Sequence, residues 1–345
     1  MSLQNWGWTS FWAQRFAASA PAGLVPARVV GVSRGEFALE TETGRTRGEL
    51  SGRLEYATSS SVDLPAVGDW VAVTPTDPAL IVAVIERRSL FARATDSGER
   101  QALAANVDMA FLVCGLDGDF NVRRIERYLV LAREASAEPV ILLNKRDVCN
   151  DPASALQAVS TLARAILVSA LLDDIPTLLG GFVEPGQTAA LLGSSGVGKS
   201  TLVNALLGVA AQETFAVRED DSRGRHTTTN RALFRMPGDW LLVDMPGLRS
   251  VGIGGSSAAI DDAFEDITEL AKQCRFHNCT HGGEPDCAVT AQLDAARIES
   301  YHKLQREAAH QHRKEDATAA RAEKEKWKAI HRAFNKRVDK RDALE

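Results

Sequence analysis

The sequence predicts a multidomain α/β protein with a small N-terminal β-barrel, a central domain built on a parallel sheet, and a helical, metal-binding C-terminal segment. Three observations support this fold class. Short β-rich runs broken by turn residues fill residues 27–95, and apolar runs alternating with helical stretches begin at Asn106. Three cysteines then fall within fourteen residues of an Ala-, Glu-, Lys- and Arg-rich sequence. The 345 residues leave room for two or three cores.

These composition changes divide the chain into four segments. We expect an aromatic N-terminal extension, an OB-like barrel, an α/β domain and a helical zinc-binding domain, at residues 1–25, 26–97, 98–255 and 256–345. The extension carries five large aromatic side chains at helix-like spacing: Trp6, Trp8, Phe11, Trp12 and Phe16.

The barrel is predicted from about five short strands in some seventy residues. The clearest runs are Arg28–Val32, Glu36–Glu40, Gly68–Val73 and Leu80–Ile85. Glycines such as Gly44 and Gly48 are interpreted as turns between strands. A closed barrel has no free edge, and barrels of this kind often bind RNA or single strands. A barrel that only supports its neighbour is the alternative.

The central domain is predicted as a parallel sheet covered by helices. Five apolar runs are expected to be strands: Val107–Cys114, Pro139–Leu143, Ala165–Val168, Thr188–Leu192 and Trp240–Val243. Two amphipathic stretches between them, residues 121–136 and 200–208, are expected to be helices.

A full G-x-x-x-x-G-K-S phosphate loop (P-loop) is the sharpest local motif. It follows an apolar strand and opens a helix, in the order Gly193, Ser194, Ser195, Gly196, Val197, Gly198, Lys199, Ser200 and Thr201. Its glycines allow backbone N–H groups to point at phosphate oxygens, and the helix N-terminus favours their negative charge. Lys199 is expected to hold the β- and γ-phosphates, and Ser200 a Mg²⁺ ion.

Two further elements predict that the base is guanine. Asn144, Lys145 and Asp147 match N-K-x-D at the end of a strand. A carboxylate at the last position accepts two hydrogen bonds from guanine that adenine cannot offer. Lys145 is expected to lie along the base plane, and Asn144 to hold the loop and contact the base edge. Ser169 and Ala170 resemble the element whose backbone N–H contacts guanine O6.

The two switch elements follow the P-loop. Asp244 begins D-x-x-G and is expected to orient Mg²⁺, while Gly247 offers its N–H to the γ-phosphate. One threonine of the preceding polar stretch completes the Mg²⁺ shell, for which we favour Thr228 over its two neighbours. Leu248 stands where many GTPases carry a water-orienting Gln, so intrinsic turnover should be slow. A partner or His226 is expected to substitute for it, although His226 could be an ordinary loop residue.

The five elements occur in an altered order, with base recognition first, then the P-loop, then the switches. The sequence therefore predicts a circularly permuted P-loop GTPase domain that binds GTP and GDP. Such a permutation is tolerated when the original termini lie close together at the surface.

The cysteine cluster predicts one structural Zn²⁺. Cys274, Cys279, His281 and Cys287 supply three thiolates and an imidazole, a closed tetrahedral set without a place for a reactive water. His277 is a rival fourth ligand, and buried free cysteines are the alternative.

Charge is unevenly distributed along the chain. The net charge is −5, but residues 301–345 carry 13 Lys and Arg against 8 Asp and Glu. This tail could lie on RNA phosphates or be a solvated helix face. No signal peptide or spanning segment is read from the sequence, so we expect a cytoplasmic monomer that does not contact membranes.

Taken together, these motifs resemble the circularly permuted, small-subunit-dependent bacterial GTPases of the RsgA (YjeQ) family. The resemblance implies an OB-fold, a permuted GTPase domain and a zinc domain. It also implies GTP hydrolysis stimulated by the 30S ribosomal subunit during its late maturation, with 16S rRNA as a partner. The resemblance further implies that the switch histidine, here His226, assists hydrolysis. The motifs themselves add Lys199 and Gly247 as the residues expected to act on the phosphates.

Three rival functions stay open. A permuted GTPase of the large ribosomal subunit would be separated from the favoured one by subunit binding. A nucleotide-gated RNA-binding module with incidental hydrolysis would show no stimulation by subunits. A P-loop kinase would need an acceptor site and would not need the N-K-x-D element.

Overall fold

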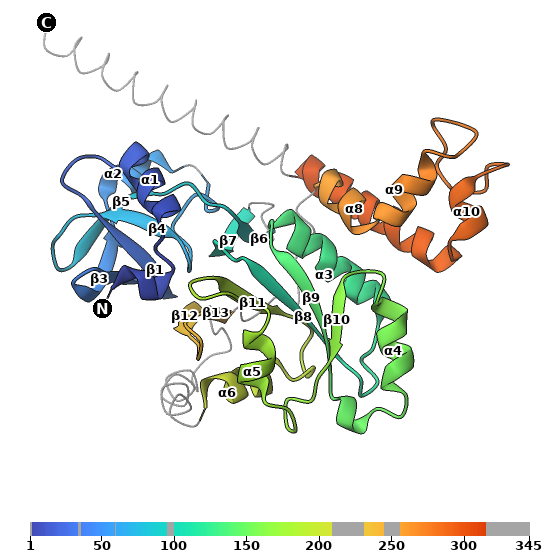
Figure 1. Cartoon of the computed structure of the whole chain (residues 1–345). Coiled ribbons are helices and arrows are strands. Elements are labelled where there is room, and N and C mark those ends of the chain that lie inside the picture. Colours follow the sequence, from blue (N-terminus) through green and yellow to red (C-terminus); the bar gives the residue numbers. More distant parts are fainter. Residues whose placement is uncertain are drawn as a thin grey trace, which may run out of the picture.

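The computed structural model describes residues 2–33, 36–58, 60–94, 100–208, 231–244 and 256–314. A barrel, a sheet covered by helices and a C-terminal group of helices follow one another along the chain (Figure 1). In these ranges no helix combines the length and the apolar character needed to cross a bilayer.

The barrel contains five strands and closes on itself. Its strands are β1 (Val25–Ser33), β2 (Glu36–Thr41), β3 (Gly44–Leu50), β4 (Trp70–Val73) and β5 (Ala79–Val84), with helix α2 (Gly52–Ala57) between β3 and β4. They pair in the order β1-β2-β3-β5-β4, and β4 returns to β1. The predicted N-terminal barrel is therefore confirmed.

Strand β3 differs from the prediction, which places turns at two of its glycines. Gly44 and Gly48 instead lie within β3, which pairs with β2 over five residues. A Cβ atom on Gly48 would lie 2.5 Å from Leu39 Cδ1, which is closer than packed atoms approach. This glycine leaves room for the barrel core, whereas most other β3 side chains are polar and at least partly exposed.

The central sheet continues from the barrel. Its strands are β8 (Met109–Gly115), β9 (Glu138–Asn144), β10 (Arg164–Leu167), β11 (Thr188–Leu192), β12 (Arg231–Arg235) and β13 (Leu241–Asp244). The order is β10-β9-β8-β11-β13-β12, and all neighbours are parallel except β12 with β13. The parallel strands end at one edge of the sheet, where α/β proteins bind ligands.

Helices cover both faces of this sheet. α3 (Val122–Glu134) and α4 (Pro152–Val159) share a core with Leu112 and Ile141, while α5 (Ile175–Gly180) and α6 (Lys199–Leu207) share one with Phe111 and Leu142. Adjacent strand residues thus point to opposite faces. Because both faces are covered, the strands read as continuous apolar runs in the sequence.

The barrel and the central sheet are joined by backbone pairing and a buried arginine. Gly31 and Val32 of β1 pair with the start of β12. Arg28, which is 2% exposed, donates to the Thr188 hydroxyl at 3.1 Å. Its guanidinium lies 4.9 Å from the ring centre of Trp70, and burial lowers the pKa of Arg28 to about 10. The strand that leads to the P-loop therefore begins against the barrel.

The aromatic N-terminus packs on the barrel. A 3₁₀ turn η1 (Leu3–Trp6) precedes α1 (Ser10–Ser19), and the Trp8 and Trp70 rings lie 4.6 Å apart. Trp12 is buried at 2% exposure. Between the barrel and β8, strands β6 (Leu90–Ala94) and β7 (Arg100–Ala105) form an antiparallel pair that spans our predicted border at residue 97.

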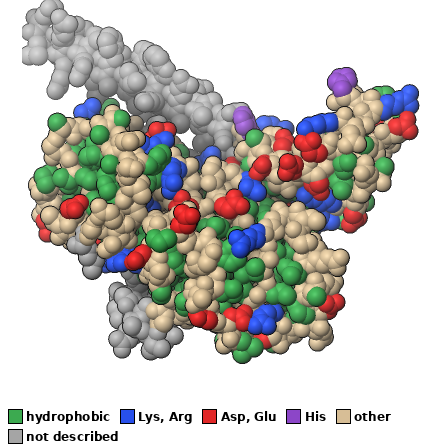
Figure 2. Space-filling view, viewed as in Figure 1, with side chains coloured by type: hydrophobic (Ala, Val, Ile, Leu, Met, Phe, Trp, Pro, Cys, Tyr) green, Lys and Arg blue, Asp and Glu red, His purple; other side chains and the backbone are tan. Residues whose placement is uncertain are grey.

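The C-terminal segment is helical. It contains α8 (Ser257–Ala263), α9 (Glu265–Ala271), α10 (Ala288–Gln292) and a helix over residues 295–314. Acidic and basic side chains are interspersed over this segment in the face shown in Figure 2. Most of the predicted basic tail, residues 315–345, lies outside the described residues.

Candidate nucleotide and metal sites

The P-loop connects β11 to α6 at the carboxyl edge of the sheet. Gly196 and Gly198 have φ angles of +84° and +96°, in the region where glycine is favoured. Helix α6 begins at Lys199, directly after the loop. The N-terminus of a helix after such a loop offers free backbone N–H groups that can bind an anion.

Close packing fixes both ends of the loop. A Cβ atom on Gly198 would lie 2.3 Å from Asn144 Nδ2, and one on Gly193 would lie 2.5 Å from the Val113 carbonyl oxygen. Both contacts are too short for a side chain. Packing therefore requires glycine at both positions, and at Gly198 the positive φ requires it as well.

Asn144 joins three sequence elements in one buried side chain. It ends β9 at 1% exposure, and its Nδ2 donates to the Val197 carbonyl of the P-loop at 2.8 Å. Its Oδ1 accepts the Ala170 N–H at 3.1 Å. The N-K-x-D loop, the Ser169–Ala170 element and the P-loop are thus held together by one amide.

Lys145 adds a second link to the P-loop. Its Nζ donates to the Gly196 carbonyl at 2.6 Å and pairs with the Asp117 carboxylate. Its backbone adopts φ +65°, which turns the chain at the end of β9. Lys145 also lines a pocket beside the loop.

This pocket, of about 290 Å³, lies where the three elements meet. Its lining includes Asp117, Asn144, Lys145, Asp147, Val148, Ala170, Leu171, Gly198 and Thr201. Asp147 is exposed, and Val148 and Leu171 are 61% and 76% exposed. The pocket thus combines a carboxylate acceptor with apolar walls, which suit the edge and the faces of a purine.

An ion pair supports the loop after β10, which carries Ser169 and Ala170. Arg146 pairs with Asp173, whose Oδ2 also accepts the Ser169 N–H at 2.7 Å. The hydrogen bond from Arg146 holds the pKa of Asp173 below its ordinary value. The Ser169 side chain is fully buried. Burial of this side chain and the hydrogen bond from its backbone N–H to Asp173 together hold the loop after β10 in place.

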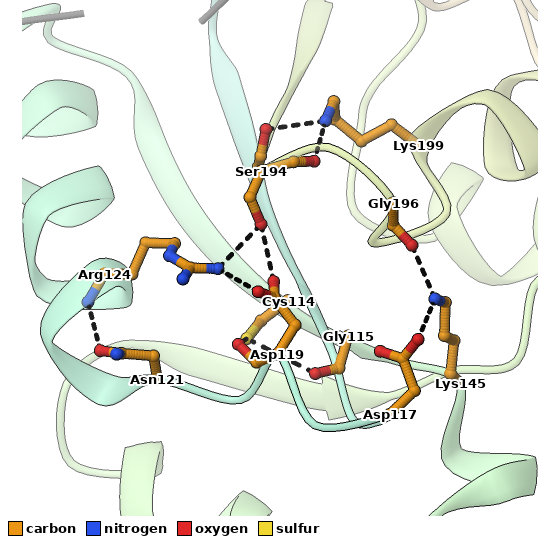
Figure 3. A network of polar contacts seen from close by, with 11 residues as sticks. Cys114, Gly115, Asp117, Asp119, Asn121, Arg124, Lys145, Ser194, Gly196 and Lys199 are labelled. Carbon is orange, nitrogen blue, oxygen red and sulfur yellow. Dashed lines mark hydrogen bonds and ion pairs between the residues drawn. The ribbon is translucent and has the colours of Figure 1, made fainter. Parts of the chain in front are cut away.

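At the other end of the P-loop, Lys199 Nζ contacts the carbonyls of Gly193, at 2.7 Å, and Ser194. The Ser194 hydroxyl donates to Asp119 at 2.7 Å and accepts from Arg124 at 2.9 Å (Figure 3). Burial alone would raise the pKa of Asp119, but hydrogen bonds from Arg124 and Ser194 hold it below its ordinary value.

The structure therefore brings the predicted base-recognition residues and the P-loop together. Asp244 ends β13, which pairs directly with β11, the strand that leads to the P-loop. The Asp244 backbone therefore lies at the same carboxyl edge of the sheet as the P-loop. Three predicted residues, His226, Thr228 and Gly247, lie outside the described residues, as does Leu248.

Sequence reasoning missed Asp117, Asp119 and Arg124. The two aspartates follow the predicted strand that ends at Cys114, and Arg124 opens the next helix. A polar run at the carboxyl end of a strand is a sequence signal for a site residue. Only the strand order, with β8 beside β11, shows that this run lies against the P-loop.

Cys274, Cys279, His281 and Cys287 form a Cys₃His set that could hold a metal ion. Their ligand atoms all lie within 4.8 Å of one another. The Cys274 and Cys287 sulfurs are 3.8 Å apart, and His281 Nδ1 lies 3.7 and 3.4 Å from them. A tetrahedral Zn²⁺ with ordinary bond lengths requires separations of about 3.8 Å between sulfurs and about 3.6 Å between sulfur and nitrogen. The four residues fit this ion, and His281 rather than the rival His277 faces the sulfurs.

Glu284 organises the loop around this set. Its carboxylate accepts the Thr280 hydroxyl and the N–H groups of Thr280 and Gly282, both at 2.8 Å. These bonds, led by the one from the hydroxyl, lower the pKa of Glu284 to about 2. The loop that carries His281 is thereby held by one carboxylate.

Known proteins resemble this chain over nearly its whole length. A protein of Opitutus terrae named small ribosomal subunit biogenesis GTPase RsgA is 42% identical, and the alignment covers 96% of each chain. A protein of the same name from Streptomyces coelicolor is 43% identical, over 89% of this chain and 86% of its own. The family described as 50S ribosome-binding GTPase also matches, over residues 188–335.

Solved structures share the fold. The crystal structure of YjeQ from Thermotoga maritima superposes with a TM-score of 0.61 at 26% identity, covering 83% of this chain and 99% of that one. YloQ, described as a circularly permuted GTPase, superposes with a TM-score of 0.60 at 21% identity, over 85% and 97%. The predicted fold class is thereby confirmed. The family described as RsgA GTPase matches residues 84–254, and with these relatives the chain belongs to the RsgA GTPase family.

Proposed function

We propose that this protein binds and hydrolyses GTP during biogenesis of the small ribosomal subunit. The observation that carries the proposal is the Asn144 side chain, which joins the base-recognition loops to the P-loop in a chain whose relatives are named small ribosomal subunit biogenesis GTPases. A protein that bound phosphate alone would not need this link. Late maturation is the stage at which we expect it to act.

The described residues would divide the nucleotide between them. Asp147 would accept two hydrogen bonds from guanine, and the backbone at Ser169 and Ala170 would reach O6. Lys145 would lie along the base, as its position in the pocket wall supports. The P-loop backbone from Gly193 through Thr201 would cradle the phosphates.

Hydrolysis would require Mg²⁺ with GTP. Ser200 is the second residue of α6, directly after the P-loop glycines. Its hydroxyl, with a second hydroxyl and a carboxylate, is the kind of oxygen set that Mg²⁺ prefers. We assign the second hydroxyl to Thr228 and the carboxylate to Asp244. Lys199 and the Gly247 N–H would stabilise charge on the γ-phosphate, and His226 would assist the attacking water.

The Cys₃His set would hold one structural Zn²⁺. The separations between its ligand atoms support this assignment, and a closed set provides no site for a reactive water. The ion would stabilise a short irregular segment that has little apolar core of its own.

The partner would be the 30S subunit, with 16S rRNA contacted in a GTP-dependent way by a monomer. We also propose that the four sequence segments, with borders near residues 25, 97 and 255, act as functional units. The match to the family described as 50S ribosome-binding GTPase favours the large subunit as a second candidate. Sedimentation with purified 30S or 50S subunits and a nonhydrolysable GTP analogue separates the two.

Base specificity tests the proposal at the site itself. Wild-type protein should bind GDP at least 100-fold more tightly than ADP, because an unpaired carboxylate disfavours adenine. Xanthine carries a carbonyl in place of the guanine amino group, so Asp147→Asn should weaken GDP binding and strengthen binding of xanthosine diphosphate. Equal affinities of the wild type for GDP and ADP would contradict the proposal.

A further inference from the structure

Helix α3 lies between the P-loop and the C-terminal helices. Its Arg124 donates to the Ser194 hydroxyl of the P-loop at 2.9 Å, and its Glu126 contacts Arg297 and Ser300 of the C-terminal helix. Side chains two positions apart on a helix point about 200° from each other. One short helical stretch therefore faces the nucleotide site on one side and the C-terminal segment on the other.

On the P-loop side, the contact reaches Lys199 through one residue. The Ser194 hydroxyl is held by Asp119 and Arg124, while the Ser194 carbonyl accepts a hydrogen bond from Lys199 Nζ (Figure 3). Arg124 also pairs with Asp119, so the three side chains form a closed set. A displacement of Arg124 would therefore move the residue that carries the Lys199 contact.

On the C-terminal side, the contact is buried. The Glu126 side chain has no exposed surface, and its carboxylate accepts the Ser300 hydroxyl and an Arg297 N–H at 2.9 Å. Arg297 also pairs with Asp266 and stacks 4.0 Å from the ring centre of Phe264. A buried carboxylate is costly without such partners, which fixes this geometry strongly.

The same C-terminal segment carries the metal-ligand set. The Cys287 sulfur caps α10 by accepting the Thr290 N–H at 3.5 Å. The helix that contains Arg297 and Ser300 begins three residues after α10 ends. The metal-ligand set, this helix, α3 and the P-loop are thus joined by a continuous series of short connections.

We propose that α3 transmits a displacement of the C-terminal segment, caused by a macromolecule that binds it, to the P-loop. Arg124 and Glu126 are the positioning residues at the two contacts of α3. The inference rests on the proposed function, because it takes the P-loop to bind nucleotide phosphates. A macromolecule that shifts the C-terminal segment would change the position of Ser194 and Lys199, and with it nucleotide affinity. The residues named on this path lie outside the two predicted switch elements in the sequence.

Two neighbouring residues of one helix provide a matched test. Ser300→Ala removes the hydroxyl that contacts Glu126, whereas Tyr301→Phe removes a hydroxyl that contacts Asp261 of α8, at 3.0 Å. The full-length zinc-loaded protein is titrated with fluorescent GDP, and hydrogen exchange is followed at the P-loop amides. Ser300→Ala should raise the GDP dissociation constant on the order of 3- to 10-fold and accelerate P-loop exchange. Tyr301→Phe should change neither by more than about twofold.

A double-mutant cycle completes the test. Arg124→Gln cuts the connection at the P-loop, so adding Ser300→Ala to it should cause no further change. Additive effects, or equal effects of Ser300→Ala and Tyr301→Phe, would overturn the proposal. If Ser300→Ala lowers the melting temperature markedly, Arg297→Lys serves as the second variant. Hydrogen exchange reports the link even without nucleotide, so unchanged P-loop exchange in Ser300→Ala would refute the link. Failure of the wild type to bind GDP would refute only the proposed function.

Discussion

Substitution of Asn144 by alanine should damage nucleotide binding more than its small change in volume suggests. The variant removes the donor to the Val197 carbonyl and the acceptor of the Ala170 N–H. Because residue 144 is 1% exposed, water does not readily replace these bonds. Each unsatisfied buried group costs about 1–3 kcal/mol. A combined penalty of about 2–6 kcal/mol on the binding-competent loops corresponds to roughly a 30- to 25,000-fold loss of affinity.

The assay is equilibrium titration of fluorescent GDP, with the melting temperature as a check on folding. Asn204→Ala, an exposed position on α6, is the matched control and should stay within about twofold of wild type. Asn144→Asp keeps the acceptor for Ala170 but directs a carboxylate oxygen at the Val197 carbonyl, so it should bind at least as weakly as the alanine variant. A folded Asn144→Ala protein with less than threefold loss would refute the argument.

Three other predictions follow from the same structure. Gly198→Ala should reduce GDP affinity by at least 100-fold in the titration, since its φ is +96° and its Cβ would meet Asn144 at 2.3 Å. His226→Ala should lower the maximal rate of GTP hydrolysis at least 100-fold while GDP affinity stays within about twofold, and parallel losses would contradict its catalytic role. Glu284→Gln should weaken Zn²⁺ retention against a chelator about tenfold. Because the depressed pKa of about 2 keeps Glu284 ionised, its contribution is lost only as pH falls below about 4.5 toward 2. The ratio of Zn²⁺ retention between the wild type and Glu284→Gln should therefore be constant from pH 8 to pH 6.

The sequence predicted the five parallel strands of the central sheet, because they form apolar runs, but it did not predict the antiparallel strand β12, whose side chains are mostly only partly buried. The strand predicted at Thr188–Leu192 matches β11, and the helix predicted over residues 121–136 appears as Val122–Glu134. The polar strand β3 was not predicted. Most of its side chains are polar and at least partly exposed, so it shows no apolar pattern. At Gly48, where the strand is buried, the missing side chain leaves room for Leu39.

The candidate site was predictable where a motif fixes spacing along the chain. It was not predictable where residues meet only through strand order, as Asp119 and Arg124 meet Ser194. The packing of the aromatic N-terminus was likewise invisible, because its partner Trp70 lies some sixty residues away in the barrel.

GTP hydrolysis by the purified protein, alone and with added 30S or 50S subunits, tests the central claim most directly. ATP serves as the control for base specificity. We expect slow hydrolysis by the protein alone, because Leu248 cannot orient water, and strong stimulation by 30S subunits only. Stimulation by 50S subunits alone, or by neither subunit, would contradict the proposed role in small-subunit biogenesis.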